Sequence, residues 1–153
     1  MDIRYYHDND YLSLAHWWDK EASGSWPLKS LPDCLAKSNY SMQVVVDSKN
    51  ISGACLFSVI ADQCELLFIA VDPCKKRRGM ASCLLRSLID NCQKLAIKNI
   101  FLEVRESNFQ AIALYYEAGF LMTGRRESYY PSLLADTAMR EAALTFQCVI
   151  NPV

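Results

Sequence analysis

Residues 66–82, LLFIAVDPCKKRRGMAS, decide the fold of this chain. Asp72 and Pro73 end an apolar strand, since proline cannot donate to a sheet ladder, and four cations then precede Gly79 and a predicted helix. The first N–H groups of a helix are unpaired, and the helix dipole favours an anion beside them. The sequence therefore predicts a phosphate-binding loop between a strand and a helix. A solvated basic turn, or a basic patch for localisation or RNA, is the alternative interpretation.

Hydrophobic periodicity extends this strand–loop–helix unit in both directions. The patterns predict strands at residues 3–6, 41–46, 51–61, 65–71, 99–105, 120–129 and 142–149. They predict helices at residues 11–20, 32–37, 80–96 and 108–118, the first with Leu12, Ala15 and His16 at helical spacing and the last ended by a left-handed Gly119. Strands that alternate with helices, flanked by antiparallel-looking pairs, indicate an α/β fold. We expect one domain over residues 1–153, with a mixed, mostly antiparallel sheet and helices on both faces.

Composition narrows the class of protein. The 153 residues are 52% hydrophobic and 22% charged, as in a soluble globular domain. The net charge of -1 argues against direct nucleic-acid binding, and the sequence shows no secretory signal and no membrane-spanning run, which predicts a cytoplasmic location. Seven cysteines without a C-x-x-C pair, accompanied by two histidines, predict reduced thiols and no metal site. Cys74 lies beside four cations, and we expect it to be an adventitious thiol rather than a nucleophile.

The loop also carries a family resemblance. KRRGMA, residues 76–81, resembles the motif (Arg/Gln)-x-x-Gly-x-(Gly/Ala) of the GCN5-related N-acetyltransferases, with lysine at the leading position. This resemblance implies acetyl-coenzyme A as co-substrate, with its pyrophosphate held by the loop and its pantetheine arm paired with the preceding strand. The cofactor-binding residues that it implies are Ile69, Ala70, Val71, Arg77, Arg78, Gly79, Met80, Ala81, Ser82 and Asn108.

Longer segments are similar to the ribosomal-protein-alanine N-acetyltransferases of the RimI type. These segments are FIAVDP, LEVRESNFQAIALYYEAGF and RRESYYP, spread in order over residues 65–131. The similarity implies acetylation of the N-terminal alanine of small-subunit ribosomal protein eighteen. An acetyltransferase for a small amine or another peptide, and a non-catalytic module that binds coenzyme A or a ribosomal partner, are the other interpretations.

Acetyl transfer to an amine needs a base, and Glu103 is the candidate. Alternate residues of its strand form an apolar face, which directs Glu103 to the opposite face with Phe101 and Arg105. The strand pattern alone favours a structural ion pair with Arg105 or Arg126. The resemblance instead implies that Glu103 is the general base.

The departing thiolate needs a proton, and Tyr115 is the candidate donor because a phenol is protonated at neutral pH. Its alternative role is in an aromatic packing stripe with Ile112 and Tyr116. The resemblance aligns Tyr115 with the family's proton-donating tyrosine. It also implies that a backbone N–H in a bulge at residues 69–71 holds the oxyanion.

Aromatic residues are expected at the acceptor side. By resemblance Trp26, Tyr129 and Tyr130 border the peptide slot, although each could equally anchor a loop. The order Trp26-Pro27 is the reverse of the family's usual Pro-Trp. The apolar residues 133–139 replace a polar, glycine-containing turn, and the sequence leaves open whether they reshape the slot, contact a second copy or pack.

Overall fold

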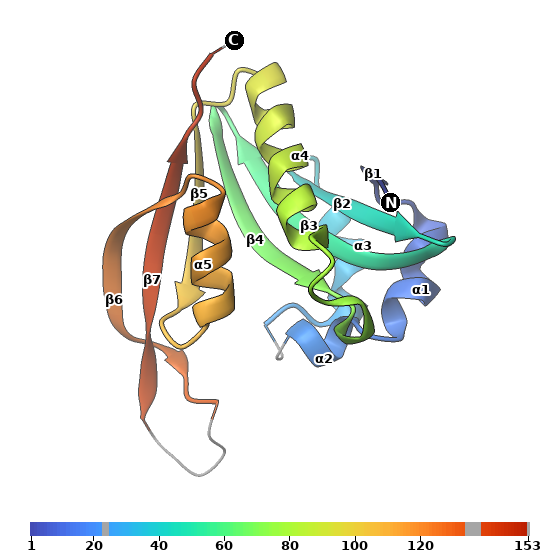
Figure 1. Cartoon of the computed structure of the whole chain (residues 1–153), viewed down its shortest axis with the longest axis horizontal. Coiled ribbons are helices and arrows are strands. Elements are labelled where there is room, and N and C mark those ends of the chain that lie inside the picture. Colours follow the sequence, from blue (N-terminus) through green and yellow to red (C-terminus); the bar gives the residue numbers. More distant parts are fainter. Residues whose placement is uncertain (23–24, 134–138, 153) are drawn as a thin grey trace.

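A single sheet runs through the computed structural model, which describes residues 1–22, 25–133 and 139–152. Within these ranges the strand order is β1–β2–β3–β4–β5–β7–β6 (Figure 1). Only β4 and β5 pair in parallel, and the other neighbours are antiparallel, which confirms the predicted mixed sheet. The strands are β1 (Asp2–Tyr5), β2 (Tyr40–Asp47), β3 (Asn50–Ile60), β4 (Gln63–Val71), β5 (Asn99–Arg105), β6 (Leu121–Pro131) and β7 (Arg140–Val149).

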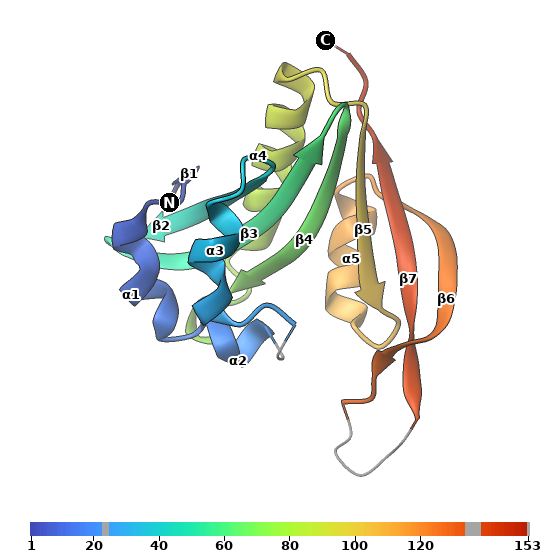
Figure 2. The same cartoon turned by 180° about the vertical axis from the view of Figure 1, so that it is seen from behind.

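Helices cover both faces of the sheet, as the sequence predicted. On one face lie α4 (Met80–Lys94) and α5 (Phe109–Glu117), and on the other α1 (Tyr11–Ala15), α2 (Trp18–Ala22) and α3 (Leu31–Leu35) (Figures 1 and 2). Each face has its own hydrophobic core, one under α4 and α5 and the other under α1 to α3. No helix among the described residues is long and apolar enough to span a membrane.

The two long helices begin and end where the local sequence directs. In α4, Met80, Leu84 and Leu88 are buried at helical spacing. The side chain of Asn108 accepts a hydrogen bond from the Ala111 amide at 3.2 Å and caps α5, and Gly119 follows with a φ of 97°. The helices predicted at 80–96 and 108–118 are therefore confirmed to within one or two residues.

The single helix predicted at residues 11–20 is wrong, because the chain bends between α1 and α2. The predicted spacing residue Leu12 is 76% exposed, whereas Leu14, Trp17 and Trp18 are buried. The Trp17 indole donates a hydrogen bond to the Ile51 carbonyl at 3.0 Å. Burying two tryptophans stabilises the fold more than burying a regular helix face of smaller residues would. The break between α1 and α2 allows both tryptophans to be buried.

The two strands β4 and β5 separate after a short contact. They pair only at one end, where Gln63, Cys64 and Glu65 lie opposite Asn99, Ile100 and Phe101. Beyond this point the strands diverge, as both views of the ribbon show (Figures 1 and 2). The register of β4 against β3 also shifts at Leu67, because Leu56 pairs with Phe68 and Phe57 with Leu66. The bulge expected at residues 69–71 is thus at Leu67 instead, where the extra residue bends β4.

Candidate active site

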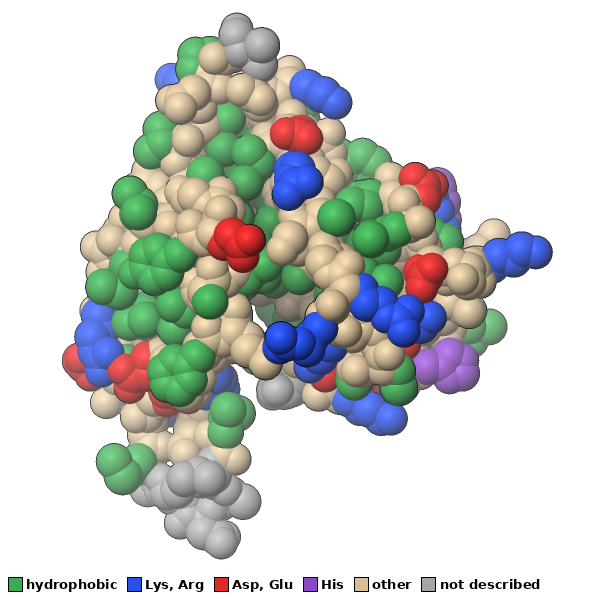
Figure 3. Space-filling view, viewed as in Figure 1, with side chains coloured by type: hydrophobic (Ala, Val, Ile, Leu, Met, Phe, Trp, Pro, Cys, Tyr) green, Lys and Arg blue, Asp and Glu red, His purple; other side chains and the backbone are tan. Residues whose placement is uncertain are grey.

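The divergence of β4 and β5 opens a cleft of about 610 Å³. Figure 3 shows the hollow, with Lys and Arg side chains gathered at its edge near the loop that precedes α4. Distant parts of the chain line this cleft: the segment before α3, β4, β5, α5 and the end of β6. Among the predicted site residues, the lining includes Trp26, Ile69, Ala70, Glu103, Asn108, Tyr115, Tyr129 and Tyr130.

Glu103 lies on the wall that β5 gives to the cleft, on the face predicted from strand alternation. Ile100, Leu102 and Val104 are buried on the opposite face, while Phe101 is 39% exposed. The carboxylate pairs with Arg126, whose Nε lies 3.3 Å from Oε1. The ion pair expected from the strand pattern is therefore present, with Arg126 as the partner of Glu103. The pair does not close the site, because the Arg126 side chain is 58% exposed and exposed ion pairs are weak.

Tyr115 projects from α5 and is only 6% exposed. Its ring lies 5.8 Å from that of Phe120 and 6.1 Å from that of Phe146, so it both packs and lines the cleft. Burial raises the pKa of the phenol well above its usual value. The hydroxyl therefore stays protonated at neutral pH, as a proton donor requires. Its neighbour Tyr116 is 49% exposed and fits the purely packing role.

The predicted phosphate loop has left-handed backbone at two positions. Arg77 has a φ of 64° and Gly79, which precedes α4, a φ of 76°. A Cβ built on Gly79 would meet nothing within 4 Å, so backbone conformation rather than space explains the glycine. The N–H groups of Met80, Ala81 and Ser82 belong to the first helical turn, where no intrahelical acceptor exists. This arrangement suits a phosphate anion.

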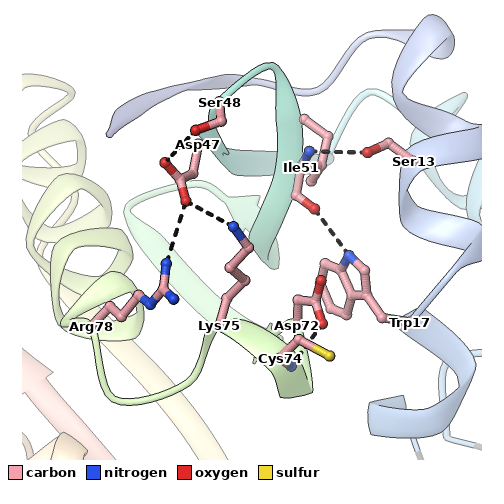
Figure 4. A network of polar contacts seen from close by, with 9 residues as sticks. All are labelled: Ser13, Trp17, Asp47, Ser48, Ile51, Asp72, Cys74, Lys75 and Arg78. Carbon is pink, nitrogen blue, oxygen red and sulfur yellow. Dashed lines mark hydrogen bonds and ion pairs between the residues drawn. The ribbon is translucent and has the colours of Figure 1, made fainter.

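Two acidic residues hold the cations of this loop. Asp47, the last residue of β2, lies 3.2 Å from Lys75 Nζ and 3.9 Å from Arg78 Nη1 (Figure 4). The hydrogen bond from Lys75 lowers the pKa of Asp47. Glu21 of α2 pairs with Lys76 at 3.0 Å. Sequence reasoning missed both carboxylates, because their only signal is proximity in the fold.

The remaining cofactor candidates are divided between the cleft and the core. Ile69 and Ala70 line the cleft, but the side chain of Val71 is only 9% exposed and belongs to the core under α4. Met80 is buried in the same core, so it could contact a ligand only through its backbone. Arg77 and Arg78 are exposed at the loop itself.

The acceptor candidates form an aromatic border. The Trp26 carbonyl accepts a hydrogen bond from the Trp18 indole at 2.6 Å. The rings of Tyr129 and Tyr130 are in edge-to-face contact at 4.9 Å, and the Arg126 guanidinium lies over Tyr129 at 5.4 Å. The Trp26 backbone and the two tyrosine rings are thus anchored, and all three residues line the cleft. Of the apolar segment at 133–139, residues 134–138 lie outside the described residues.

A second cavity of about 370 Å³ adjoins the cleft on the Glu103 face of β5. The two spaces share Glu65 and Glu103 in their linings. Neither in the cleft nor elsewhere do the described residues include a group of three His, Cys, Asp or Glu side chains that could hold a metal ion. The site therefore combines two adjoining spaces with a basic loop, a carboxylate and a phenol.

Comparisons of its sequence and structure with known proteins show the family to which this chain belongs. The model of the acetyltransferase (GNAT) family matches residues 11–120. The ribosomal protein bS18-alanine N-acetyltransferase of Escherichia coli is 36% identical over 107 residues, which are 70% of this chain and 72% of that protein. The crystal structure of the Escherichia coli enzyme matches with a TM-score of 0.87 at 29% identity, over 99% of this chain and 95% of that one.

A Bacillus subtilis acetyltransferase, solved in complex with CoA, has the same fold with a TM-score of 0.78 at 14% identity, over 97% of this chain and 98% of that one. The match to the family model spans well over half of the chain, and the Escherichia coli relative exceeds 30% identity over more than two thirds of its own length. The chain therefore belongs to the acetyltransferase (GNAT) family, and it is an N-acetyltransferase with the single-domain α/β fold of that family.

Proposed function

We propose that this enzyme transfers the acetyl group of acetyl-coenzyme A to the N-terminal alanine of the small-subunit ribosomal protein bS18. The observation that carries the proposal is that Glu103 and Tyr115 line one cleft, in a chain similar to an enzyme named for that reaction. The proposed domain spans residues 1–153 and acts in the cytoplasm, without a metal, a membrane or direct nucleic-acid contact.

The loop before α4 would hold the pyrophosphate of the co-substrate. The N–H groups of residues 77–82 and the side chains of Arg77 and Arg78 are the proposed ligands. Ile69, Ala70 and Asn108 line the cleft and would border the rest of the cofactor, with Val71 contributing backbone only. When bound, acetyl-coenzyme A supplies the acetyl group as a reactive thioester.

The acceptor amine would enter between Trp26 on one side and Tyr129 and Tyr130 on the other. Glu103 would accept the proton of the amine, directly or through a water, so that the nitrogen can attack. An α-amine with a pKa near roughly 8 needs only modest help of this kind. The Arg126 guanidinium, 3.3 Å from the Glu103 carboxylate, would help to orient it in the cleft.

On the other wall, Tyr115 would donate its proton to the departing sulfur. Its raised pKa keeps the phenol protonated, and its packing against Phe120 and Phe146 fixes the ring. A backbone N–H of β4, after the register shift at Leu67, would hold the acetyl carbonyl oxygen.

The test is release of free coenzyme A thiol from acetyl-coenzyme A with and without an Ala-Arg-Tyr-Phe peptide. Peptide-dependent release, with one acetyl group added at the peptide N-terminus, would support the proposal, and an N-terminally blocked peptide is the control. Release with small amines but not with the peptide would redirect the acceptor assignment. Thermal stabilisation by acetyl-coenzyme A without any release would support the cofactor assignment and direct the search to other acceptor amines.

A further inference from the structure

A partly buried ion pair joins the end of β5 to the beginning of β7 beside the cleft. Arg105 Nη1 lies 3.2 Å from Glu141 Oε2, and the two side chains are 17% and 14% exposed. Although burial opposes it, the hydrogen bonds from Ser107 and Arg105 hold the pKa of Glu141 below its usual value. The pair is therefore ionised at neutral pH, and we call it the Arg105–Glu141 clamp.

On one side the clamp reaches the proposed acceptor slot. The Arg105 guanidinium donates to the Pro131 carbonyl at 2.7 Å and lies 4.6 Å from the centre of the Tyr130 ring. Nη1 makes the hydrogen bonds to both Pro131 and Glu141, and the planar guanidinium lies over the Tyr130 ring, whereas a lysine ammonium has no plane to place there. The end of β6 pairs with β7 and accepts two hydrogen bonds from Arg140, and this side chain from β5 is a further contact that holds it.

On its other side the clamp reaches the proposed cofactor wall. Glu141 Oε1 accepts a hydrogen bond from the Ser107 amide at 2.7 Å. Ser107 precedes Asn108, the cap of α5, and α5 carries Tyr115. A single carboxylate therefore links the arginine that holds the acceptor side to the turn that starts the proton-donor helix.

We infer that Arg105 is a positioning residue for the acceptor, and that Glu141 transmits this position to the start of α5. Arg105 lines the cleft, but its guanidinium is engaged with Pro131, Tyr130 and Glu141. It acts by holding Tyr130 at the mouth of the site, not by touching the reacting atoms. The kinetic part of this inference rests on the proposed function.

The chain offers a matched control in Arg125. This arginine also pairs with two carboxylates, Glu106 and Glu127, but its side chain is 45% exposed and it does not line the cleft. Replacing it with lysine makes the same chemical change on β6 without loosening the clamp. Both variants keep the net charge of the enzyme.

The experiment compares Arg105→Lys with Arg125→Lys in steady-state kinetics on the Ala-Arg-Tyr-Phe peptide. For Arg105→Lys we expect kcat/KM for the peptide to fall about 10- to 100-fold, because small displacements of positioning groups have effects of this size. The dissociation constant of acetyl-coenzyme A should stay within threefold, and Arg125→Lys should match the wild type. A peptide kcat/KM within threefold of wild type for Arg105→Lys would overturn the inference.

A double variant separates positioning from general destabilisation. If Arg105 acts through Tyr130, the losses in kcat/KM from Arg105→Lys and Tyr130→Ala should not multiply, since the second change removes what the first one displaces. The losses from Arg105→Lys and Trp26→Ala should multiply, because Trp26 belongs to another segment. Full multiplication in the Tyr130 pair would contradict the assigned role.

Amide hydrogen exchange tests the clamp without any acceptor. Glu141→Ala should speed exchange at the Ser107 amide at least tenfold, and Arg105→Lys should speed exchange at the Tyr129 and Tyr130 amides, relative to Arg125→Lys. Unchanged protection in both segments would refute the clamp. If the wild-type enzyme acetylates no alanine peptide, the proposed function fails, whereas the exchange result still decides whether the clamp holds these segments.

Discussion

Removing the Tyr115 hydroxyl should separate catalysis from stability. In Tyr115→Phe the ring keeps its contacts with Phe120 and Phe146, and only the oxygen is lost. Within the described part of the chain the hydroxyl has no hydrogen-bond partner, and Tyr115 lines the cleft. We therefore expect the free energy of unfolding to change by less than about 1 kcal/mol, which is within ~4 °C of melting temperature for a chain of this size.

The turnover number kcat of Tyr115→Phe should fall strongly, although its stability changes little. Loss of a general acid lowers kcat by roughly 10²- to 10⁴-fold, or about 3–5 kcal/mol of transition-state stabilisation. The assay is thiol release at saturating acetyl-coenzyme A and peptide, with melting measured on the same samples and Tyr116→Phe as the exposed control. A variant that melts like the wild type and retains kcat within threefold would remove Tyr115 from the mechanism.

Three further results are expected. Glu103→Gln should lower kcat about 10²- to 10⁴-fold in the same assay. The control variant Glu117→Gln, on the exposed surface of α5, should not lower kcat. Equal rates for both variants would exclude Glu103 as the base. Gly79→Ala should raise the KM for acetyl-coenzyme A and destabilise the fold by about 1–2 kcal/mol, because φ is +76° there; an unchanged KM would argue against the phosphate role. Asp10→Asn should cost about 2 kcal/mol in urea unfolding at pH 7, since Asp10 is buried and accepts two hydrogen bonds from Arg4.

The loss of stability in Asp10→Asn should depend on pH, and it should become smaller as the pH falls. The hydrogen bond from Arg4 lowers the pKa of Asp10 in the folded state. Its contribution is therefore complete above the unfolded pKa of about 3.9 and is lost as the pH falls through the lower, folded value. The difference between Asp10→Asn and the wild type should shrink as the pH falls below about 3.9, and a difference that does not shrink with falling pH would contradict the assignment.

Local chemistry explains what could be predicted from the sequence. The strand before Asp72, the left-handed Gly119 and the buried row of α4 depend on residues close together in the chain, and the structure has all three. The faces of β5 follow from strict alternation, so the orientation of Glu103 was accessible too.

Features that depend on distant partners were not accessible. Whether Trp17 is buried depends on Ile51, and this contact interrupts the predicted first helix. The sequence offered Arg105 as an ion-pair partner of Glu103, whereas its actual partner, Glu141, lies on β7. The shift at Leu67 depends on the pairing of two strands and leaves no mark in composition or periodicity.

The short contact between β4 and β5 has a consequence for solubility. Open strand edges usually invite other chains to add to a sheet, and this leads to aggregation. Here the divergence creates two such edges inside the protein, facing each other across the cleft, with aromatic side chains from other segments along its border. The divergence thus keeps backbone groups available at the centre of the protein, inside a cleft of about 610 Å³ and not on an outer edge of the sheet.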